Sequence, residues 1–80
     1  MNATSKVTVE QKGHVLLIGL NRPEKLNAAD MEMLQELALA YGKLDSDPEL
    51  RVGLVFAHGD HFTAGLDLAD VAPRLNADGL

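Results

Sequence analysis

Two short apolar segments near the start of the chain predict a β-hairpin. In residues 6–11 valines alternate with polar residues, which is the two-residue period of a strand with one buried face. We expect this strand to lie at the edge of a sheet. Residues 15–20 are almost continuously apolar, which predicts a strand covered on both faces. The turn signal Lys12-Gly13 joins the two strands.

The middle of the chain predicts an amphipathic helix and then a second apolar strand. Asp30 is suited to cap the helix start, where the helix dipole also favours Glu32. Residues 45–49 end the helix with turn formers and a proline, and residues 52–57 form the strand. Strand, helix and strand make a βαβ unit with parallel strands. Apolar residues at three- and four-residue spacing define the predicted buried helix face: Met31, Leu34, Leu37, Ala38, Tyr41 and Leu44.

The loops that follow the two parallel strands form the candidate site. Residues 21–28 are polar, and residues 61–70 read HFTAGLDLAD. Both loops leave the carboxyl ends of their strands, and open α/β sheets bind ligands at that edge. The small residues 63–65 leave backbone N–H groups with little side chain over them, which suits a carbonyl oxygen. Beyond this turn we expect only a short helix, because Pro73 interrupts the helical spacing.

Length and composition limit the classes of protein to which this chain can belong. Eighty residues suit one small domain with a marginal core, since such a chain buries only roughly 60% of its unfolded surface, so we expect a partner or further chain. Seven basic residues against twelve acidic ones give no stripe for nucleic acid. No apolar stretch approaches the roughly 20 residues that span a membrane. With no cysteine and no apolar centre in the first ten residues, we expect a cytoplasmic protein.

Several polar residues have an ordinary structural explanation beside a functional one. His58, Asp60 and His61 could ligate a metal, but an exposed Gly-Asp turn explains them as well, and we expect no metal site. His14 is expected to be a solvated turn residue. Asp67 is expected to cap a helix instead of acting as a catalytic acid.

The two loops also allow an ordinary interpretation. Pro23 is expected to hold Arg22 extended, and Arg22 and Lys25 are by default solvated loop charges. Gly65 and Leu66 form either an anion or oxyanion site or an ordinary turn between a strand and a helix, because such turns are common.

Two motifs in sequence order resemble the crotonase superfamily of enoyl-CoA hydratases and isomerases. They are NRPEKLNA before the predicted helix and RVGLVFAHGDHFTAGLDL after it, and the resemblance runs from about Val7 to Val71. It implies that residues 1–80 are a partial crotonase-like domain, the N-terminal ββαβ portion of the α/β ClpP/crotonase spiral fold. Members hydrate, isomerise, dehalogenate, hydrolyse, decarboxylate or condense acyl-CoA thioesters, and the resemblance favours enoyl-CoA hydratase/isomerase activity.

The resemblance also implies roles for particular residues. The Leu66 backbone N–H corresponds to an oxyanion-hole donor to the thioester oxygen, and Gly65 allows close approach of the substrate. Backbone groups of Ala64, Leu66 and Leu68 resemble those that hold the adenine end of coenzyme A. Lys25 is placed like the basic residues near its phosphates, and Ala28 like a residue lining the thioester and pantetheine channel. Leu66 is bulkier than the alanine frequent in the family.

The resemblance further implies an acyl-CoA thioester substrate, with coenzyme A arriving as part of it, no permanently bound cofactor, and a homotrimer or hexamer. The family's second oxyanion donor and its acid and base carboxylates lie in later segments. We therefore expect an N-terminal fragment that is inactive by itself. The alternative is a non-enzymatic interaction module, which the small core and the acidic balance favour.

Overall fold

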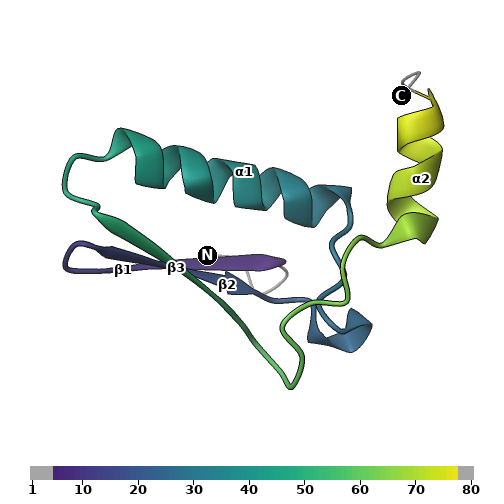
Figure 1. Cartoon of the computed structure of the whole chain (residues 1–80), viewed down its shortest axis with the longest axis horizontal. Coiled ribbons are helices and arrows are strands. Elements are labelled where there is room, and N and C mark those ends of the chain that lie inside the picture. The colour runs from purple at the N-terminus through teal and green to yellow at the C-terminus, as the bar shows by residue number, and fades with distance from the viewer. Residues whose placement is uncertain (1–4, 78–80) are drawn as a thin grey trace.

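The computed structural model describes residues 5–77. Its elements follow one another in the order predicted, with an additional 3₁₀ turn in the first loop (Figure 1). The elements are β1 (Val7–Lys12), β2 (Val15–Leu20), η1 (Pro23–Lys25), α1 (Met31–Ser46), β3 (Val52–Ala57) and α2 (Leu68–Ala77). This is the predicted ββαβ arrangement, and the α/β class is confirmed.

The three strands form one sheet in the order β1-β2-β3. β1 pairs with β2 antiparallel, as predicted for a hairpin, with Val7 opposite Leu20. β2 pairs with β3 in parallel, with Leu20 opposite Ala57. The register therefore ends β2 and β3 at the same edge of the sheet, and the loops that follow them leave from that edge.

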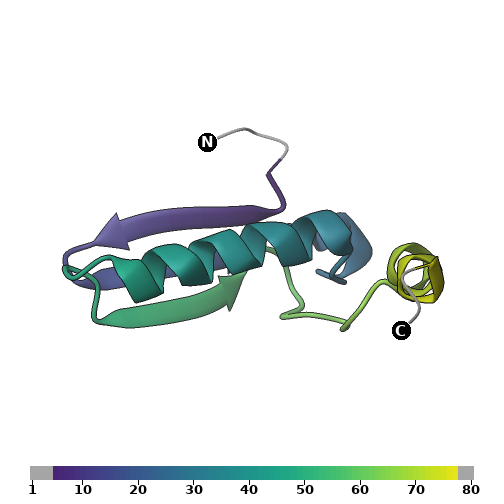
Figure 2. The ribbon, with the colours of Figure 1, turned by 90° about the horizontal axis from the view of Figure 1, so that it is seen from above.

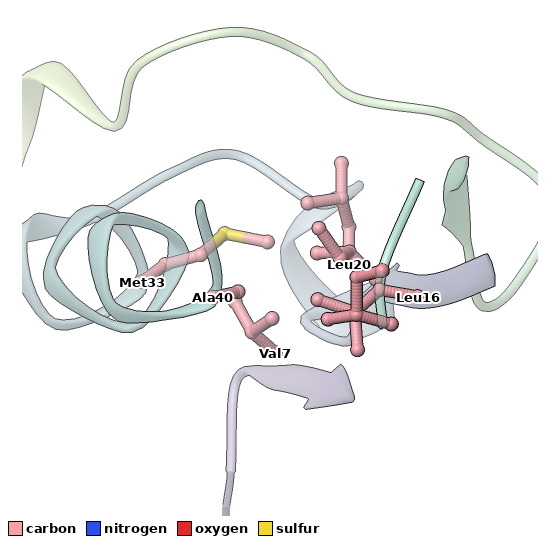
Figure 3. Close-up of a cluster of buried hydrophobic side chains, with 7 residues drawn as sticks. Val7, Leu16, Leu20, Met33 and Ala40 are labelled. Carbon is pink, nitrogen blue, oxygen red and sulfur yellow. The ribbon is translucent and has the colours of Figure 1, made fainter. Parts of the chain in front are cut away.

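The core lies between α1 and one face of the sheet (Figures 1 and 2). The side chains of Leu16, Ile18 and Leu20 alternate along β2 and are buried towards α1. Met33 and Ala40 are the fully buried residues of the helix, and Figure 3 shows them beside Val7, Leu16 and Leu20. The core is small, as expected of a chain of this length.

The helix face towards the sheet overlaps the predicted one only in part. Leu37 and Leu44 of the predicted set pack against the core, together with the buried Met33 and Ala40. The prediction was wrong for Ala38, which is exposed, and for Tyr41, which is 49% exposed. Periodicity fixes the spacing of a buried stripe but does not choose between two that share it.

The other face of the sheet has no covering element within residues 5–77 (Figure 1). Val52 and Leu54 on this face are 53% and 50% exposed, and Leu17 is half-buried. The prediction that the second strand is covered on both faces is therefore wrong for the described residues. An apolar run predicts that both faces are suited to burial, not that both are buried within the same segment.

The last helix also differs from expectation. α2 continues through Pro73 to Ala77, although we predicted that the proline would stop it. Proline has a helical φ and removes a single backbone donor, so one lost hydrogen bond does not end the helix here. α2 stands beyond the edge at which β2 and β3 end (Figures 1 and 2). Among residues 5–77 we find no helix with the length and apolarity that crossing a bilayer requires.

Candidate functional site

The buried side chain of Asn27 joins the two loops at the carboxyl edge of the sheet. Its Nδ2 donates to the carbonyl oxygens of His58 and His61, at 2.8 Å each. Its Oδ1 accepts from the Arg22 N–H at 2.6 Å, and its own carbonyl accepts from Thr63 Oγ1 at 2.7 Å. Asn27 is 1% exposed. The role of Asn27 was not predicted from the sequence. Each polar group of its side chain forms a hydrogen bond to the backbone of another residue.

The backbone around Asn27 is in an uncommon conformation. Leu26 and Asn27 have φ of 54° and 56°, in the left-handed region where residues other than glycine are infrequent. Asparagine tolerates this region better than leucine, because its short polar side chain can bond locally. The preceding 3₁₀ turn leads into it from Arg22, whose ψ of 54° is not the extended value predicted. The loop therefore reverses sharply before α1.

A short parallel bridge connects the segment before α1 to residues 61–67, which we call the glycine loop. Ala29 pairs with Leu66: the Ala29 N–H donates to the Gly65 carbonyl at 2.7 Å, and the Asp67 N–H donates to the Ala29 carbonyl at 2.9 Å. Gly65 has a φ of 95°, a conformation that glycine adopts without strain. The residues on both sides of Leu66 are thus fixed to the same partner.

The bridge leaves the Leu66 N–H without a partner among residues 5–77. The Ala64 N–H donates to the Leu26 carbonyl at 3.0 Å, and the Gly65 N–H donates to Thr63 Oγ1 at 3.0 Å. The Asp67 N–H is used in the bridge. In contrast, the Leu66 N–H donates to nothing within residues 5–77, and Leu66 is 51% exposed. A single open donor between satisfied neighbours is available to a ligand oxygen.

This donor lies before the helix, not in its first turn. We expected the glycine turn to lead directly into a helix, with the donor fixed at the helix start, but α2 begins at Leu68. The bridge to Ala29 holds the Leu66 backbone instead.

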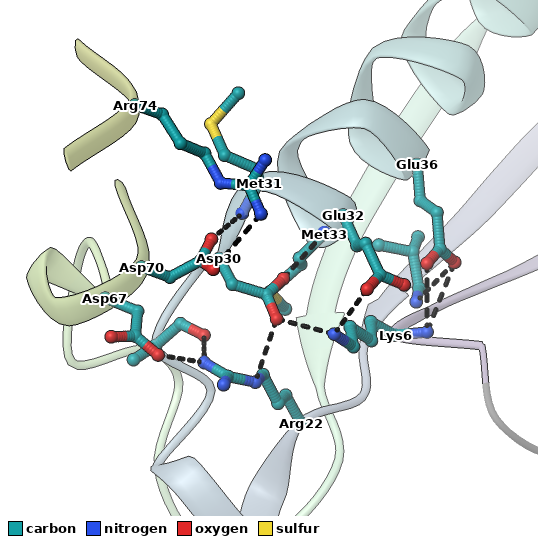
Figure 4. Close-up of polar contacts among 12 residues, drawn as sticks. Lys6, Arg22, Asp30, Met31, Glu32, Met33, Glu36, Asp67, Asp70 and Arg74 are labelled. Carbon is teal, nitrogen blue, oxygen red and sulfur yellow. Dashed lines mark hydrogen bonds and ion pairs between the residues drawn. The ribbon is translucent and has the colours of Figure 1, made fainter. Parts of the chain in front are cut away.

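Arg22 connects the same segments from the other side (Figure 4). Its Nη1 donates to the Ala28 carbonyl at 2.9 Å and to Asp67 Oδ2 at 2.8 Å. Its Nε lies 3.5 Å from Asp30 Oδ2, which also accepts from Lys6 Nζ at 2.5 Å. The Arg22 side chain is only 12% exposed. The expectation of a solvated loop charge was therefore wrong for Arg22.

Neighbouring charges and N–H groups shift four pKa values in this cluster, including that of Lys6, which its hydrogen bond to Asp30 raises. Burial by itself would raise the pKa of Asp30, but hydrogen bonds from Lys6 and the Met33 N–H lower it on balance. The Arg22 hydrogen bond lowers the pKa of Asp67, and the Asp70 and Ala69 N–H groups act in the same direction, as expected of a helix cap. The Asp67 hydrogen bond in turn raises the pKa of Arg22. The cluster is thus stabilised in its charged form.

Asp30 also caps α1 as predicted. Its Oδ1 accepts from the Met33 N–H at 2.9 Å, and its backbone is extended. Asp70 of α2 accepts from the Met31 N–H at 2.9 Å (Figure 4). The start of α1 is therefore fixed to the segment that carries Leu66.

The other residues with predicted roles lie around the same edge. Lys25 is exposed at the end of η1, and Leu68 is 64% exposed at the start of α2. Ala64 is exposed, whereas Ala28 is half-buried and its carbonyl accepts from Arg22. All four lie in the two loops or beside them, and their predicted contacts with coenzyme A stay predictions.

The histidines of this region have structural contacts. His58 Nε2 lies 2.9 Å from Thr8 Oγ1, and its ring packs edge-on against Phe56 with centroids 5.1 Å apart. At the opposite end of β2, His14 is exposed, as predicted, and its Nδ1 lies 2.6 Å from the Glu49 carbonyl oxygen. Within the part of the chain that the structure describes, no group of three or more His, Cys, Asp or Glu could hold a metal ion.

A mostly apolar cleft of about 210 Å³ borders the glycine loop on the side of α1. Phe62 and Thr63 of the loop contribute to its lining, together with Asn27, Met33 and Tyr41. Leu66 is not among its lining residues, but its bridge partner Ala29 is.

Comparison with protein families decides the affiliation of the chain. Residues 10–79 match the model of a family described as enoyl-CoA hydratase/isomerase. The chain belongs to this family. The enoyl-CoA hydratase/isomerase family is the one that the two loop motifs resemble, so the crotonase resemblance and the crotonase-like fold are confirmed.

Individual relatives agree with this assignment. Enoyl-CoA hydratase EchA19 of Mycobacterium tuberculosis is 38% identical over 60 residues, which are 75% of this chain and 23% of that protein. The mitochondrial Delta(3,5)-Delta(2,4)-dienoyl-CoA isomerase of Mus musculus is 43% identical over 70 residues, 88% of this chain and 21% of that one. The crystal structure of a probable enoyl-CoA hydratase/isomerase from Mycobacterium abscessus superposes with a TM-score of 0.85 at 50% identity. This match covers 90% of the chain and 28% of the solved one. The chain thus spans about a quarter of the length of these relatives.

Proposed function

We propose that the protein carrying this chain acts on acyl-CoA thioesters as an enoyl-CoA hydratase or isomerase. The observation that carries the proposal is the Leu66 N–H, which is left open by the bridge to Ala29 while its neighbours are satisfied. Family membership supports the substrate class, because the relatives named above are a hydratase and an isomerase of CoA thioesters.

The proposed role of the N–H is electrostatic. When water adds to the β carbon of an enoyl thioester, the electron pair of the double bond moves through the α carbon onto the thioester oxygen. The resulting enolate oxygen accepts a hydrogen bond from the Leu66 N–H until a proton returns to the α carbon. A fixed donor that meets charge developing in the transition state lowers the barrier by roughly 3 to 4 kcal/mol.

The remaining site residues are assigned to substrate binding in the same proposal. Gly65 has no side chain to keep the thioester from the N–H. The backbone groups of Ala64, Leu66 and Leu68 hold the adenine end of coenzyme A. Lys25, which is exposed in the other loop, contacts its phosphates. Ala28 lines the thioester and pantetheine channel. Coenzyme A is part of the substrate, and no cofactor stays bound.

The proposal includes a cytoplasmic homotrimer or hexamer. The half-exposed Val52 and Leu54 on the open face of the sheet favour further burial, which an oligomer or additional chain provides. Light scattering of the purified full-length protein tests the oligomer, and cell fractionation tests the compartment. A strictly monomeric protein would contradict this part of the proposal.

The activity is tested with the full-length gene product and a short enoyl-CoA such as crotonyl-CoA. Loss of the conjugated enoyl absorbance reports hydration, and calorimetry reports binding of coenzyme A alone. We expect both turnover and binding. A protein that neither binds coenzyme A nor consumes the enoyl thioester would overturn the proposed function.

A further inference from the structure

The open N–H of Leu66 is useful only if its direction is fixed, and the bridge fixes it only as firmly as Ala29 is itself held. Two backbone hydrogen bonds to Ala29 hold the residues on either side of Leu66, but Ala29 itself lies in a loop between η1 and α1. The orientation of the Leu66 N–H therefore depends on contacts that hold Ala29 and residues 63–67 in place relative to each other. Hydrogen bonds are directional, so small rotations of a donor weaken them.

The Arg22 guanidinium contacts a residue next to each partner of the bridge. From a single nitrogen, Nη1, it donates to the carbonyl of Ala28, which precedes Ala29, and to the carboxylate of Asp67, which follows Leu66. Its Nε faces Asp30, the cap of α1. The guanidinium is planar and rigid, so the directions of its N–H donors are fixed relative to one another.

The backbone of Arg22 is itself held. Its backbone N–H donates to Asn27 Oδ1 at 2.6 Å, and the side chain of Arg22 is only 12% exposed. Asp30 and Asp67 surround it with two carboxylates, so its charge is already matched before any ligand arrives. Arg22 can therefore orient the groups that it contacts, but its paired charge does not attract the substrate.

We infer that Arg22 is a positioning residue, which acts through Asp67 and the Ala28 carbonyl to hold the Leu66 N–H in the direction that an acyl oxygen requires. This inference rests on the proposed function. It assigns to Arg22 no contact with the substrate.

The test measures kcat and KM of the full-length enzyme with crotonyl-CoA. We expect Arg22→Gln to lower kcat by about 10- to 100-fold, because a misplaced donor costs transition-state stabilisation. KM should change by less than about threefold, because ground-state binding is retained. Arg22→Lys keeps the charge but not the planar fork, so its kcat should lie near that of Arg22→Gln. A kcat of Arg22→Lys equal to that of the wild type would overturn the inference, since charge alone would then suffice.

Variants of Asp67 keep the test decisive if Arg22→Gln does not fold. Asp67→Asn retains an oxygen towards Arg22 and the helix cap, whereas Asp67→Ala removes both. We expect kcat to fall less in Asp67→Asn than in Asp67→Ala. A folded Asp67→Ala with the kcat of the wild type would overturn the inference. Where Arg22→Gln folds, the double variant Arg22→Gln/Asp67→Asn should be no slower than Arg22→Gln alone, because the two residues act as one unit. Independent, multiplying losses would contradict the inference.

Lys6→Gln is the matched control. It removes the other cation that contacts Asp30 but touches neither Ala28 nor Asp67. We expect its kcat to stay within about twofold of the wild type while its melting temperature falls. An equal loss of kcat in Lys6→Gln and Arg22→Gln would show a general effect on the fold and overturn the positioning role.

A spectroscopic measurement separates positioning from stability. The carbonyl stretch of bound acetyl-CoA reports the hydrogen bond to its oxygen, and in Arg22→Gln it should move back towards that of free acetyl-CoA. An unchanged stretch beside a reduced kcat would overturn the inference. A wild-type enzyme without turnover or coenzyme A binding would overturn the proposed function and the inference with it, whereas normal kcat in Arg22→Gln would overturn the inference alone.

Discussion

The two ends of the parallel strand pair β2 and β3 are held by different interactions. At the carboxyl end, buried polar side chains cross between the loops: Asn27 to His58 and His61, and Arg22 to Asp67. At the other end, the buried side chain of Leu50 leads into β3, and the crossing hydrogen bonds are those of His14: its carbonyl accepts from the Arg51 N–H at 2.8 Å, and its exposed ring contacts the Glu49 carbonyl. The difference matters because buried side-chain hydrogen bonds fix the angles of the groups they join, whereas apolar packing is not directional. The end with the buried side-chain hydrogen bonds is also the one with the open N–H.

We therefore expect catalytic activity to depend on the carboxyl end of the two strands, and the opposite end to affect only stability. Changes at the carboxyl end should affect the angle of one donor, and changes at the opposite end should affect only the free energy of unfolding. The following variants of the full-length protein test this separation, in order of expected effect.

Leu66→Pro gives the largest expected effect on activity. It deletes the open N–H, which has no partner in the described residues, so the fold loses no hydrogen bond. We expect kcat with crotonyl-CoA to fall by roughly 10²- to 10³-fold, the usual cost of one oxyanion donor. Leu66→Ala retains the N–H and shortens the side chain, so its loss should be much smaller. Near-normal turnover in Leu66→Pro would mean that another donor serves the thioester.

Asn27→Asp tests the polar end for stability. The carboxylate cannot donate to the His58 and His61 carbonyls and places a charge at a side chain that is 1% exposed. We expect the free energy of unfolding to fall by about 3 kcal/mol, measured by urea denaturation. Gln11→Glu is the matched control, because Gln11 donates to the Gly13 carbonyl from an exposed position. Equal losses in the two variants would remove the case for Asn27 as the link between the loops.

Leu50→Ala tests the apolar end. Leu50 is 7% exposed and belongs to the hydrophobic core, so its truncation leaves a cavity. We expect a loss of roughly 2 to 3 kcal/mol in the free energy of unfolding, with kcat unchanged once the protein is folded. A large fall in kcat at a temperature where Leu50→Ala is fully folded would break the proposed separation of the two ends.

The smallest expected effect is a pH dependence from Asp30. Its pKa is lowered in the folded protein: burial opposes this shift, but the hydrogen bonds from Lys6 and Met33 exceed it. A lowered pKa contributes stability that is present above the ordinary aspartate value and lost as the pH falls through the folded value. Urea denaturation between pH 7 and pH 3 should thus show a fall below about pH 4. Asp30→Asn should make the fall shallower; an identical fall would assign it to other carboxylates.

The sequence predicted most of the fold because the signals are local. Alternation in residues 6–11, the turn at Gly13 and the capping Asp30 each depend on neighbours a few residues away. The buried helix face was predicted only in part: Leu37 and Leu44 pack against the core, but Met33 and Ala40 were missed because other residues share their three- and four-residue spacing. Pro73 misled the prediction of α2, since one lost hydrogen bond does not end a helix.

The candidate site was predictable only in part. The motif around Gly65 located the loop with the open N–H, but it could not show how the loop is held. The partners of Asn27 lie 31 and 34 residues further along the chain, and Asp67 lies 45 residues from Arg22. Such pairs leave no periodic pattern in a single sequence. An asparagine next to a sharp reversal was the available hint, because asparagine tolerates the left-handed region.

The pairing of Lys6 and Arg22 with Asp30 and Asp67 has a consequence for how a substrate first approaches. Lys6 also lies 3.5 Å from Glu32, so the cluster has no excess of positive charge and attracts no anion beyond the screening distance of roughly 8 to 10 Å in salt water. Lys25, on the loop nearby, is exposed to solvent. Ionic strength should therefore slow the encounter with an anionic carrier through Lys25, while the internal geometry of the cluster is the same in dilute and concentrated salt.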